Sequence, residues 1–265
     1  MRAGKVFWGL IILFVGLVLL LEPLGILPPN TNIWRFIWPG VLIFLGVWLL
    51  VVPMLFKGKK LETESISIPL GNTSDARLRL KHGAGRLDVA ALDSADTFLT
   101  GEFGGGVDQS VHQDGSSLRI KLRTPSFDFP IGVHFEGLNW LVKMNKTIPT
   151  RLDIDSGASE TNLHLQDLKV TELNIDTGAS STTIDLPSQA GFTRVSVESG
   201  AAAVVIRVPE NVAARIQVES GLAGISINPS RFPRMGSYYE SAGYADAVNK
   251  ADILVKTGVG SLEVR

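Results

Sequence analysis

The chain has 265 residues, a formal net charge of −1, 27 glycines and no cysteine. The lack of cysteine excludes disulfide bonds, thiolate catalysis and cysteine-based metal sites. The charge is uneven, because residues 1–60 carry six Lys or Arg and one acid, a net charge of +5, and the remaining residues carry −6. An acidic body argues against nonspecific nucleic-acid binding, which needs a basic face for phosphate contacts.

Two apolar segments near the N-terminus predict a membrane anchor. Residues 6–21 are sixteen residues without a charge and residues 37–56 are twenty, against the roughly 20 that a bilayer-spanning helix needs. A cleaved signal peptide is the alternative for the first segment, but no small-x-small cleavage site follows it. We therefore predict two transmembrane helices within residues 1–60, joined by a turn rich in Pro and Asn.

The basic residues around these segments predict how the anchor is oriented. Arg2 and Lys5 precede the first segment, and only Arg35 lies in the connecting loop. Three lysines follow the second segment: Lys57, Lys59 and Lys60. Because basic residues favour the cytoplasmic side, both ends of the anchor are expected in the cytoplasm. The body of the chain is then predicted to be cytoplasmic.

The body is an internal repeat. Each of six segments alternates apolar and polar residues, ends in a charged residue, a small or polar residue and a glycine, and is followed by a second alternating stretch. The glycines are Gly83, Gly157, Gly178, Gly200, Gly221 and Gly258. The central four are separated by 21, 22 and 21 residues. A period of two along each stretch indicates strands with one buried face.

A fixed period near 21 residues, with two strands per unit, predicts stacked rungs that share one continuous core, a solenoid-like β architecture. A β-sandwich is the alternative, but the regular spacing favours stacking. The turn after the glycine is expected in two lengths. In one set the next inward apolar residue follows the glycine by six positions: Leu163, Ile184 and Ile206. In the other it follows by four: Leu87, Ile225 and Leu262.

Asp176-Thr177-Gly178-Ala179 matches the tetrapeptide expected in an aspartic protease, and residues 155–158 are a near copy. Two carboxylates that share a proton could activate a water for peptide hydrolysis. The same slot of the repeat holds an acid or a lysine in different units: Lys81, Asp155, Asp176, Glu198, Glu219 and Lys256. A lysine cannot act as a catalytic carboxylate. We therefore interpret the slot as a polar flank of the turn glycine.

No other pattern points to catalysis or ligand binding. The four histidines do not fall at HxxxH or HxH spacing: His82, His112, His134 and His164. Asp153 and Asp155 could bind Ca²⁺ only with further oxygen ligands, and the next unit has Asn174 where this one has Asp153. We predict no catalytic, cofactor-binding or metal-ligating residues, no cofactor and no small-molecule substrate.

Two segments interrupt the repeat. Residues 124–149 are rich in aromatic residues and are expected to cap an open end of the stack, with a docking surface as the alternative. Their aromatic residues include Phe127, Phe129, Phe135 and Trp140. Residues 228–252 are either a partner-binding loop or an ordered loop packed on its own stack. The side chains in question are Arg231, Arg234, Tyr238, Tyr239 and Tyr244.

Two parts of the chain resemble known bacterial families. The stretches "WGLIILFVGLVLLLEPLGIL" and "IWRFIWPGVLIFLGVWLLV" are similar to the LiaI–LiaF-like transmembrane region of envelope proteins. The repeated D-[ST]-G-A-S and E-S-G-x-A motifs resemble the toastrack or adhesin-like β domain that often follows it. The resemblance implies a membrane-anchored, nonenzymatic protein linked to cell-envelope stress signalling and to the response to cell-wall-active antibiotics.

Together these features predict a two-pass protein of the bacterial inner membrane, with a two-helix anchor over residues 1–60 and a β-repeat domain over residues 61–265. We expect it to bind a partner membrane protein or another copy of itself, because the edges of a stacked sheet can pair with other strands. An extracytoplasmic adhesin-like scaffold is the first alternative. A carbohydrate-acting enzyme on a β-solenoid is the second, and it would need acids clustered on one exposed face.

Overall fold

The computed structural model describes residues 63–125 and 138–265. Most of these residues are in β-strands, which confirms the all-β class predicted for the body. The helical structure within these ranges is a three-residue 3₁₀ turn, η1 (Tyr244–Asp246). None of the helical structure in the described part is long and apolar enough to cross a membrane. The predicted anchor over residues 1–60 lies outside the described residues.

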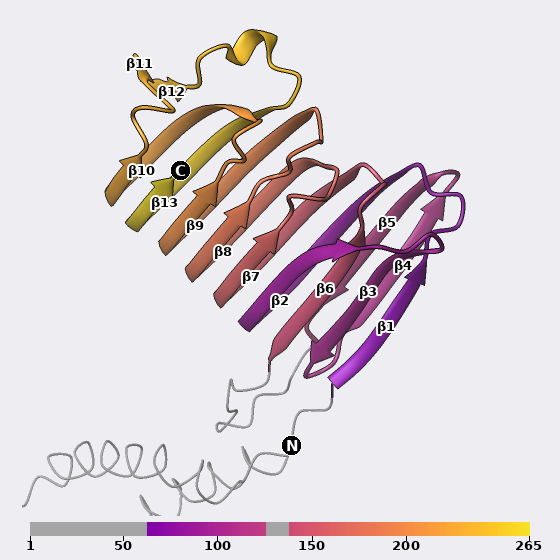
Figure 1. Ribbon diagram of the computed structural model, residues 1–265. Helices are drawn as coiled ribbons and strands as arrows, with labels where there is room; N and C mark the ends of the chain where they lie inside the picture. The colour runs from indigo at the N-terminus through magenta and orange to yellow at the C-terminus, as the bar shows by residue number, and fades with distance from the viewer. Residues whose placement is uncertain (1–62, 126–137) are drawn as a thin grey trace, which may run out of the picture. The chain divides into compact units, whose positions relative to one another are not determined.

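Thirteen strands of the described chain form one sheet (Figure 1). They are β1 (Thr63–Pro69), β2 (Asp75–Leu92), β3 (Thr97–Gly104), β4 (Asp108–Asp114), β5 (Ser117–Arg123), β6 (Asn139–Asn145), β7 (Thr150–His164), β8 (Val170–Asp185), β9 (Phe192–Arg207), β10 (Ala213–Ile227), β11 (Arg234–Met235), β12 (Tyr238–Glu240) and β13 (Lys250–Val264). The sheet order is β1-β3-β6-β2-β7-β8-β9-β13-β10-β12-β11, and β4 and β5 branch off beside β2.

Each repeat unit is one long strand with its glycine near the middle. The six long strands β2, β7, β8, β9, β10 and β13 have 15 to 18 residues each. We call the residues before the glycine the first arm and those after it the second arm. β7 pairs in parallel with β2, β8 with β7 and β9 with β8 along both arms. The predicted stacking of units is therefore observed, with one continuous strand in place of two.

The glycines form a column in which the strands approach closely. A Cβ added to Gly157 would lie 2.5 Å from the carbonyl oxygen of Gly83, and one added to Gly178 would lie 3.1 Å from that of Gly157. The same contact recurs at 3.1 Å for Gly200, 2.6 Å for Gly258 and 2.8 Å for Gly221, each against the glycine of the adjoining rung. Close backbone approach therefore requires glycine in five of the six units, whereas a Cβ at Gly83, in the first unit, would meet no atom within 4 Å.

The inward side chains of both arms belong to one hydrophobic cluster. One row of it runs through all six units at the same level of the first arm, and every member is 2 % exposed or less. The row consists of Leu78, Leu152, Leu173, Val195, Ile253 and Ile216. The alternation in the sequence thus predicts the buried face of each first arm correctly.

The turn after the glycine has one length, which corrects the prediction of two. Leu87 pairs with Thr161, Thr161 with Thr182 and Thr182 with Val204, each four positions after its glycine. All four side chains point inward and are 1 % exposed or less. In two of the three units predicted to have the longer turn, the inward residue is a threonine that was taken as outward and polar, and in the third the inward Val204 was passed over. The hydroxyl of Thr161 is buried inside the bend, 3.3 Å from the hydroxyl of Ser159, with which it forms a hydrogen bond.

The β2 end of the stack is closed by shorter strands. β5 pairs in parallel with the first arm of β2 and β6 with its second arm, so together they take the place of one rung. β4 then lies antiparallel to β5, β3 to β6, and β1 to β3. β6 comes from residues 124–149 and covers the end of the stack as expected, although as a strand of the sheet. Phe127, Phe129 and Phe135 lie outside the described residues.

The other end departs from chain order. β13 lies between β9 and β10, in parallel with both, although β10 follows β9 in the sequence (Figure 1). β10 is therefore the last long strand of the stack. The short strands β12 and β11 continue the sheet beyond it, but β12 pairs only with residues 215–217 of β10. The second arm of β10 has no strand on its outer side among the described residues.

Candidate functional site

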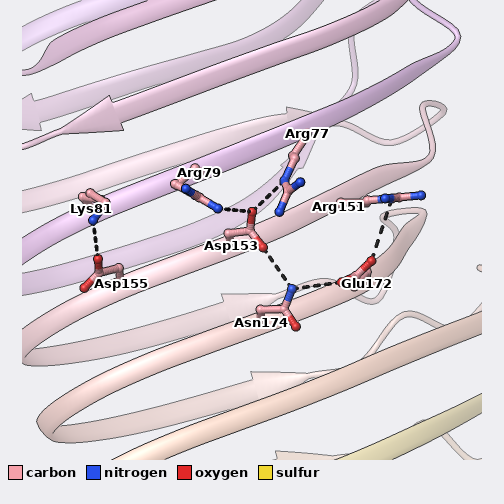
Figure 2. Close-up of polar contacts among 8 residues, drawn as sticks. All are labelled: Arg77, Arg79, Lys81, Arg151, Asp153, Asp155, Glu172 and Asn174. Atoms are coloured by element: carbon pink, nitrogen blue, oxygen red, sulfur yellow. Dashed lines mark hydrogen bonds and ion pairs between the residues drawn. The ribbon is translucent and has the colours of Figure 1, made fainter.

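The outer face of the first arms carries a ladder of charged side chains centred on Asp153 (Figure 2). Arg77 Nε donates to Asp153 Oδ2 at 2.8 Å, and Arg79 reaches the same oxygen at 3.4 Å. Asn174 Nδ2 donates to Asp153 Oδ1 at 2.9 Å. Burial alone would raise the pKa of Asp153, but these hydrogen bonds and the arginine charges lower it below its ordinary value. Asp153 is thus held as a carboxylate by its neighbours.

The aspartates of the Asp-x-Gly motifs form no catalytic dyad. Lys81 Nζ lies 2.6 Å from Asp155 Oδ2, and both side chains are about half exposed (Figure 2). Asp155 and Asp176 are in-register neighbours of β7 and β8 on the outer face, with Glu198 next in line. A shared-proton dyad requires a protected, converging pair. These carboxylates are instead a solvated row, as the repeat slot predicts.

The described histidines and acids do not converge on a metal site, and His134 lies outside the described residues. Within residues 63–125 and 138–265, no three His, Cys, Asp or Glu side chains are placed to hold a metal ion. His82 is buried beside the Trp140 ring, its Nε2 is 3.1 Å from the Leu138 carbonyl, and burial lowers its pKa. His164 Nδ1 lies 2.9 Å from Asp185 on the next strand. These contacts tie rungs together.

The interrupting residues 228–252 are packed on their own stack. The guanidinium of Arg231 donates hydrogen bonds to the carbonyl oxygens of Val208 and Pro209, and to that of Val212 at 3.3 Å. Those three residues belong to the connection between β9 and β10. Phe232 is fully buried in the core. Arg231 therefore fixes the start of the segment to the end of the sheet.

Tyrosines of the same segment pack around Arg215 of β10. The Arg215 guanidinium lies 4.5 Å from the centre of the Tyr244 ring and 5.4 Å from that of Tyr238, and its Nε is 2.6 Å from Glu240. The Tyr244 hydroxyl donates to Asp252 of β13, and burial and this bond raise the pKa of Tyr244. Of the five side chains predicted as a docking set, Tyr244 is buried and Tyr239 packs on the core, whereas Arg234 is exposed.

Three of the exposed apolar side chains of the sheet lie at the open end instead. Leu222 of β10 is 82 % exposed, and its in-register neighbour Val259 of β13 is 54 % exposed. Ile225 stands in an inward column whose other members are buried, yet it is 43 % exposed. We call the second arm of β10, residues 222–227, the open edge. The sequence gives no direct sign of it, because the repeat period places another unit beyond β10.

Stacked rungs, a solvated charge ladder and an uncovered strand at one end define a β-repeat scaffold domain. The chain belongs to the toast_rack family, because the family described as the N-terminal domain of toast_rack, DUF2154, matches residues 57–227. The LiaI–LiaF-like transmembrane region matches residues 6–50. Both matches confirm the resemblance seen in the sequence, and the second identifies a membrane protein.

The fold is similar to that of a solved protein from Clostridium sporogenes described as a "putative cell adhesion protein". The two share 18 % identity over 77 % of this chain and 98 % of that chain, with a TM-score of 0.70, which shows a common fold. A "putative adhesin" from Bacteroides fragilis aligns over 78 % of this chain and 98 % of its own, with 10 % identity and a TM-score of only 0.29. No curated protein sequence matches the chain.

Proposed function

We propose that this protein is a nonenzymatic, membrane-anchored binding protein whose open edge docks on the open edge of a second copy. In this proposal residues 1–60 are a two-helix anchor and residues 61–265 are the presenting domain. The observation that carries the proposal is Ile225, an inward core position that is 43 % exposed because no described strand pairs with the second arm of β10 on its outer side. An edge strand with free backbone groups and exposed apolar side chains is a template for strand pairing.

The described sheet ends at β1, at β4, at the open edge and at the two-residue strand β11, which carries Arg234, and these edges differ in how they are protected. β1 carries Glu64 and ends in Pro69, and β4 begins with Asp108 and ends with Asp114. Charges and proline on an edge strand oppose pairing with another chain. The open edge reads Leu-Ala-Gly-Ile-Ser-Ile and carries neither. It is therefore the edge of the described sheet that is best suited to docking.

A second copy is the occupant that this strand fits. Two uncharged strands can lie antiparallel about a twofold axis without bringing like charges together. Such a contact uses the same patch on both molecules and closes after two copies. A six-residue strand pair buries little area, which alone supports only weak association. Membrane anchoring raises the effective concentration of the copies and compensates for the small contact.

The test is a disulfide between two copies of the full chain in lipid vesicles. A Cβ at Gly224 meets no atom within 4 Å, so Gly224→Cys provides a reporter on the open edge of a chain without native cysteine. Oxidation should give a covalent dimer. Adding Ile225→Lys should abolish it, because a charge would be buried between the two strands.

Val111→Lys is the matched control for that experiment. Val111 lies on edge strand β4 and is 46 % exposed, close to the value for Ile225. The Gly224→Cys dimer should persist when Val111→Lys is added. The proposal fails if Gly224→Cys gives no dimer, or if Ile225→Lys leaves the dimer intact.

An adhesin-like scaffold outside the cytoplasm is the second candidate, favoured by the fold shared with the Clostridium sporogenes protein. We infer the cytoplasmic orientation from the lysines after the second apolar segment. If the domain is cytoplasmic, a role in envelope-stress signalling would mean that pairing of two β domains depends on the state of a partner membrane protein. The side of the membrane on which the domain lies separates the two candidates.

A further inference from the structure

Two strand orders are compatible with the core at the open end of the stack. In the observed order β13 lies between β9 and β10, and Ser196, Leu254 and Gln217 are in-register neighbours across the three strands. In the chain order β10 would lie on β9 and β13 would follow it. The glycine column and the inward apolar rows would be kept in both, because each of the three strands has the same pattern.

The connections permit either order. Residues 208–212 join β9 to β10 across two rungs, and residues 165–169, a segment of the same length, join β7 to β8 across one. The 22 residues between β10 and β13 are the longest of these connections, and chain order would displace β12 from residues 215–217 of β10. The match to the N-terminal domain of toast_rack ends at residue 227, before β13. Something other than chain length must therefore select the order.

Charges on the outer face differ between the two orders. At one level β13 places Asp252 between Arg194 of β9 and Arg215 of β10. At a second level it places Lys256 between Glu198 and Glu219, with Lys256 Nζ 3.3 Å from Glu198 Oε1. In chain order the two arginines would be neighbours, and so would the two glutamates. Neighbouring strands are about 4.8 Å apart, a separation at which like charges repel. The observed row already contains three neighbouring acids, Asp155, Asp176 and Glu198, and chain order would extend it to four.

We propose that Asp252 and Lys256 are order-determining residues, which direct β13 between β9 and β10 and thereby make β10 the strand presented at the open edge. In chain order β13 would be the last strand, and its second arm carries Glu263. The uncharged edge with Leu222 and Ile225 would then be covered. The link to docking rests on the proposed function, whereas the strand order is measured independently of it.

Reversing the charges of β9 should exchange the two orders. With Arg194→Glu and Glu198→Lys, each of the two order-determining residues of β13 in the observed order would face a like charge on β9 and an opposite charge on β10. Chain order then has two opposite-charge contacts at each level. Contacts of β9 with β8 change equally in both orders. The two substitutions lie on the solvent face, where they leave the core unchanged.

Two cysteine pairs report the order in the full chain. Ser196→Cys with Leu254→Cys is adjacent only in the observed order, and Ser196→Cys with Gln217→Cys only in chain order. Strands two rungs apart place the Cα atoms roughly 9.6 Å apart, beyond the limit of about 7 Å for a disulfide. With native charges only the first pair should close. With β9 reversed, the second pair should become the main product.

The matched control makes the same kind of reversal one rung away, with Glu172→Arg and Asp176→Lys on β8. β8 touches neither β13 nor β10, so the first cysteine pair should still close. If the double change on β9 impairs folding, Glu198→Lys alone reverses the charge at one level only. Both cysteine pairs should then close in part, because the two strand orders would coexist. The proposal is overturned if the Ser196–Gln217 disulfide never forms in a folded β9 variant, whatever the outcome of the dimer test.

Discussion

Lys256 of β13 lies 3.3 Å from Glu198 of β9, and the two residues are in-register neighbours on the outer face of the stack. At the other end of the same row Lys81 lies 2.6 Å from Asp155. Half-exposed pairs of this kind contribute only about 0–1 kcal/mol each to stability. Their larger effect is on which strand lies beside which, because each strand order brings different charges together.

Gly260 is expected to tolerate no side chain. Its φ is +135°, and a Cβ there would lie 1.9 Å from the carbonyl oxygen of Ala202 on β9. Gly260→Ala should therefore lower the free energy of unfolding by about 2–4 kcal/mol. Gly224→Ala in the neighbouring strand is the control, because its Cβ would meet open space, and it should change stability by less than about 1 kcal/mol. Urea unfolding of both variants measures the difference.

Arg231 should matter more than the other arginine of its segment. Arg231→Ala removes hydrogen bonds to three carbonyl oxygens and should cost about 2–3 kcal/mol of stability. Arg234 is exposed and donates only to the Gly236 carbonyl, so Arg234→Ala should cost less than about 0.5 kcal/mol. Thermal unfolding of the two variants distinguishes them. Equal effects would mean that Arg231 does not fix the segment to the sheet.

Asp153 should make the fold sensitive to acid. Its pKa is lowered in the folded state, so its contribution is complete above the unfolded pKa of about 3.9 and is lost as the pH falls through the folded pKa. Asp153→Asn should cost about 1 kcal/mol at pH 7. The difference in stability between the variant and the native chain should narrow as the pH falls below about 4. Denaturant unfolding at several pH values tests this.

Asp114→Asn is the control for that series. Asp114 lies on edge strand β4, its side chain is 65 % exposed, and its one ion pair is with Arg119 at 3.5 Å. The replacement should leave both the stability at pH 7 and its pH dependence close to those of the native chain. A gap that narrowed equally for both variants would assign the acid sensitivity to net charge rather than to Asp153.

Thr182 should be replaceable by valine. Thr182 is 1 % exposed and points inward, and Val204 occupies the same position in the next rung. Thr182→Val should therefore shift the free energy of unfolding by no more than about 1 kcal/mol, since it trades one hydroxyl contact with Ser180 for apolar packing. Leu163→Ala in the preceding strand should cost about 2–5 kcal/mol. Calorimetry of the two variants provides the comparison.

The side of the membrane can be read with one reporter cysteine. Ser237 is exposed at the tip between β11 and β12, so Ser237→Cys should be accessible in the folded domain. A membrane-impermeant maleimide should label it only after cell lysis if the domain is cytoplasmic. Val248→Cys, at a position 86 % exposed, is the second reporter on the same domain. Labelling of both in intact cells would support the adhesin-like scaffold instead.

The stack itself could be predicted from the sequence, because Leu152 and Ile154 alternate with polar residues and the glycines recur at a fixed spacing. The uniform turn could not be predicted from apolar residues alone. Thr161 and Thr182 have polar side chains but are buried in the bend, where their hydroxyls form hydrogen bonds with those of Ser159 and Ser180. An inward position was therefore counted as an outward one.

The candidate site was harder to predict, because it depends on strand order. The repeat spacing favours β10 directly beside β9. In our proposal, the sequence signal for the observed order is that Asp252 and Lys256 are opposite in charge to the residues beside them on β9 and β10. The exposure of Ile225 follows from that order and from the short reach of β12. Neither is a local property of the sequence. The solvated row of acids, in contrast, follows from the lysines that occupy the same slot.

From Gly157 onward, a Cβ added to a glycine of the column would meet only the glycine of an adjoining rung, so the column has no built-in length. Tandem duplication of about one period of 21 residues would add a rung with its own glycine, its own inward residues and its own loop. Deletion of one period would remove the same set. Relatives that differ in size should therefore differ by whole rungs in the middle of the domain, while the strands that close the β2 end and the strand presented at the other end stay the same.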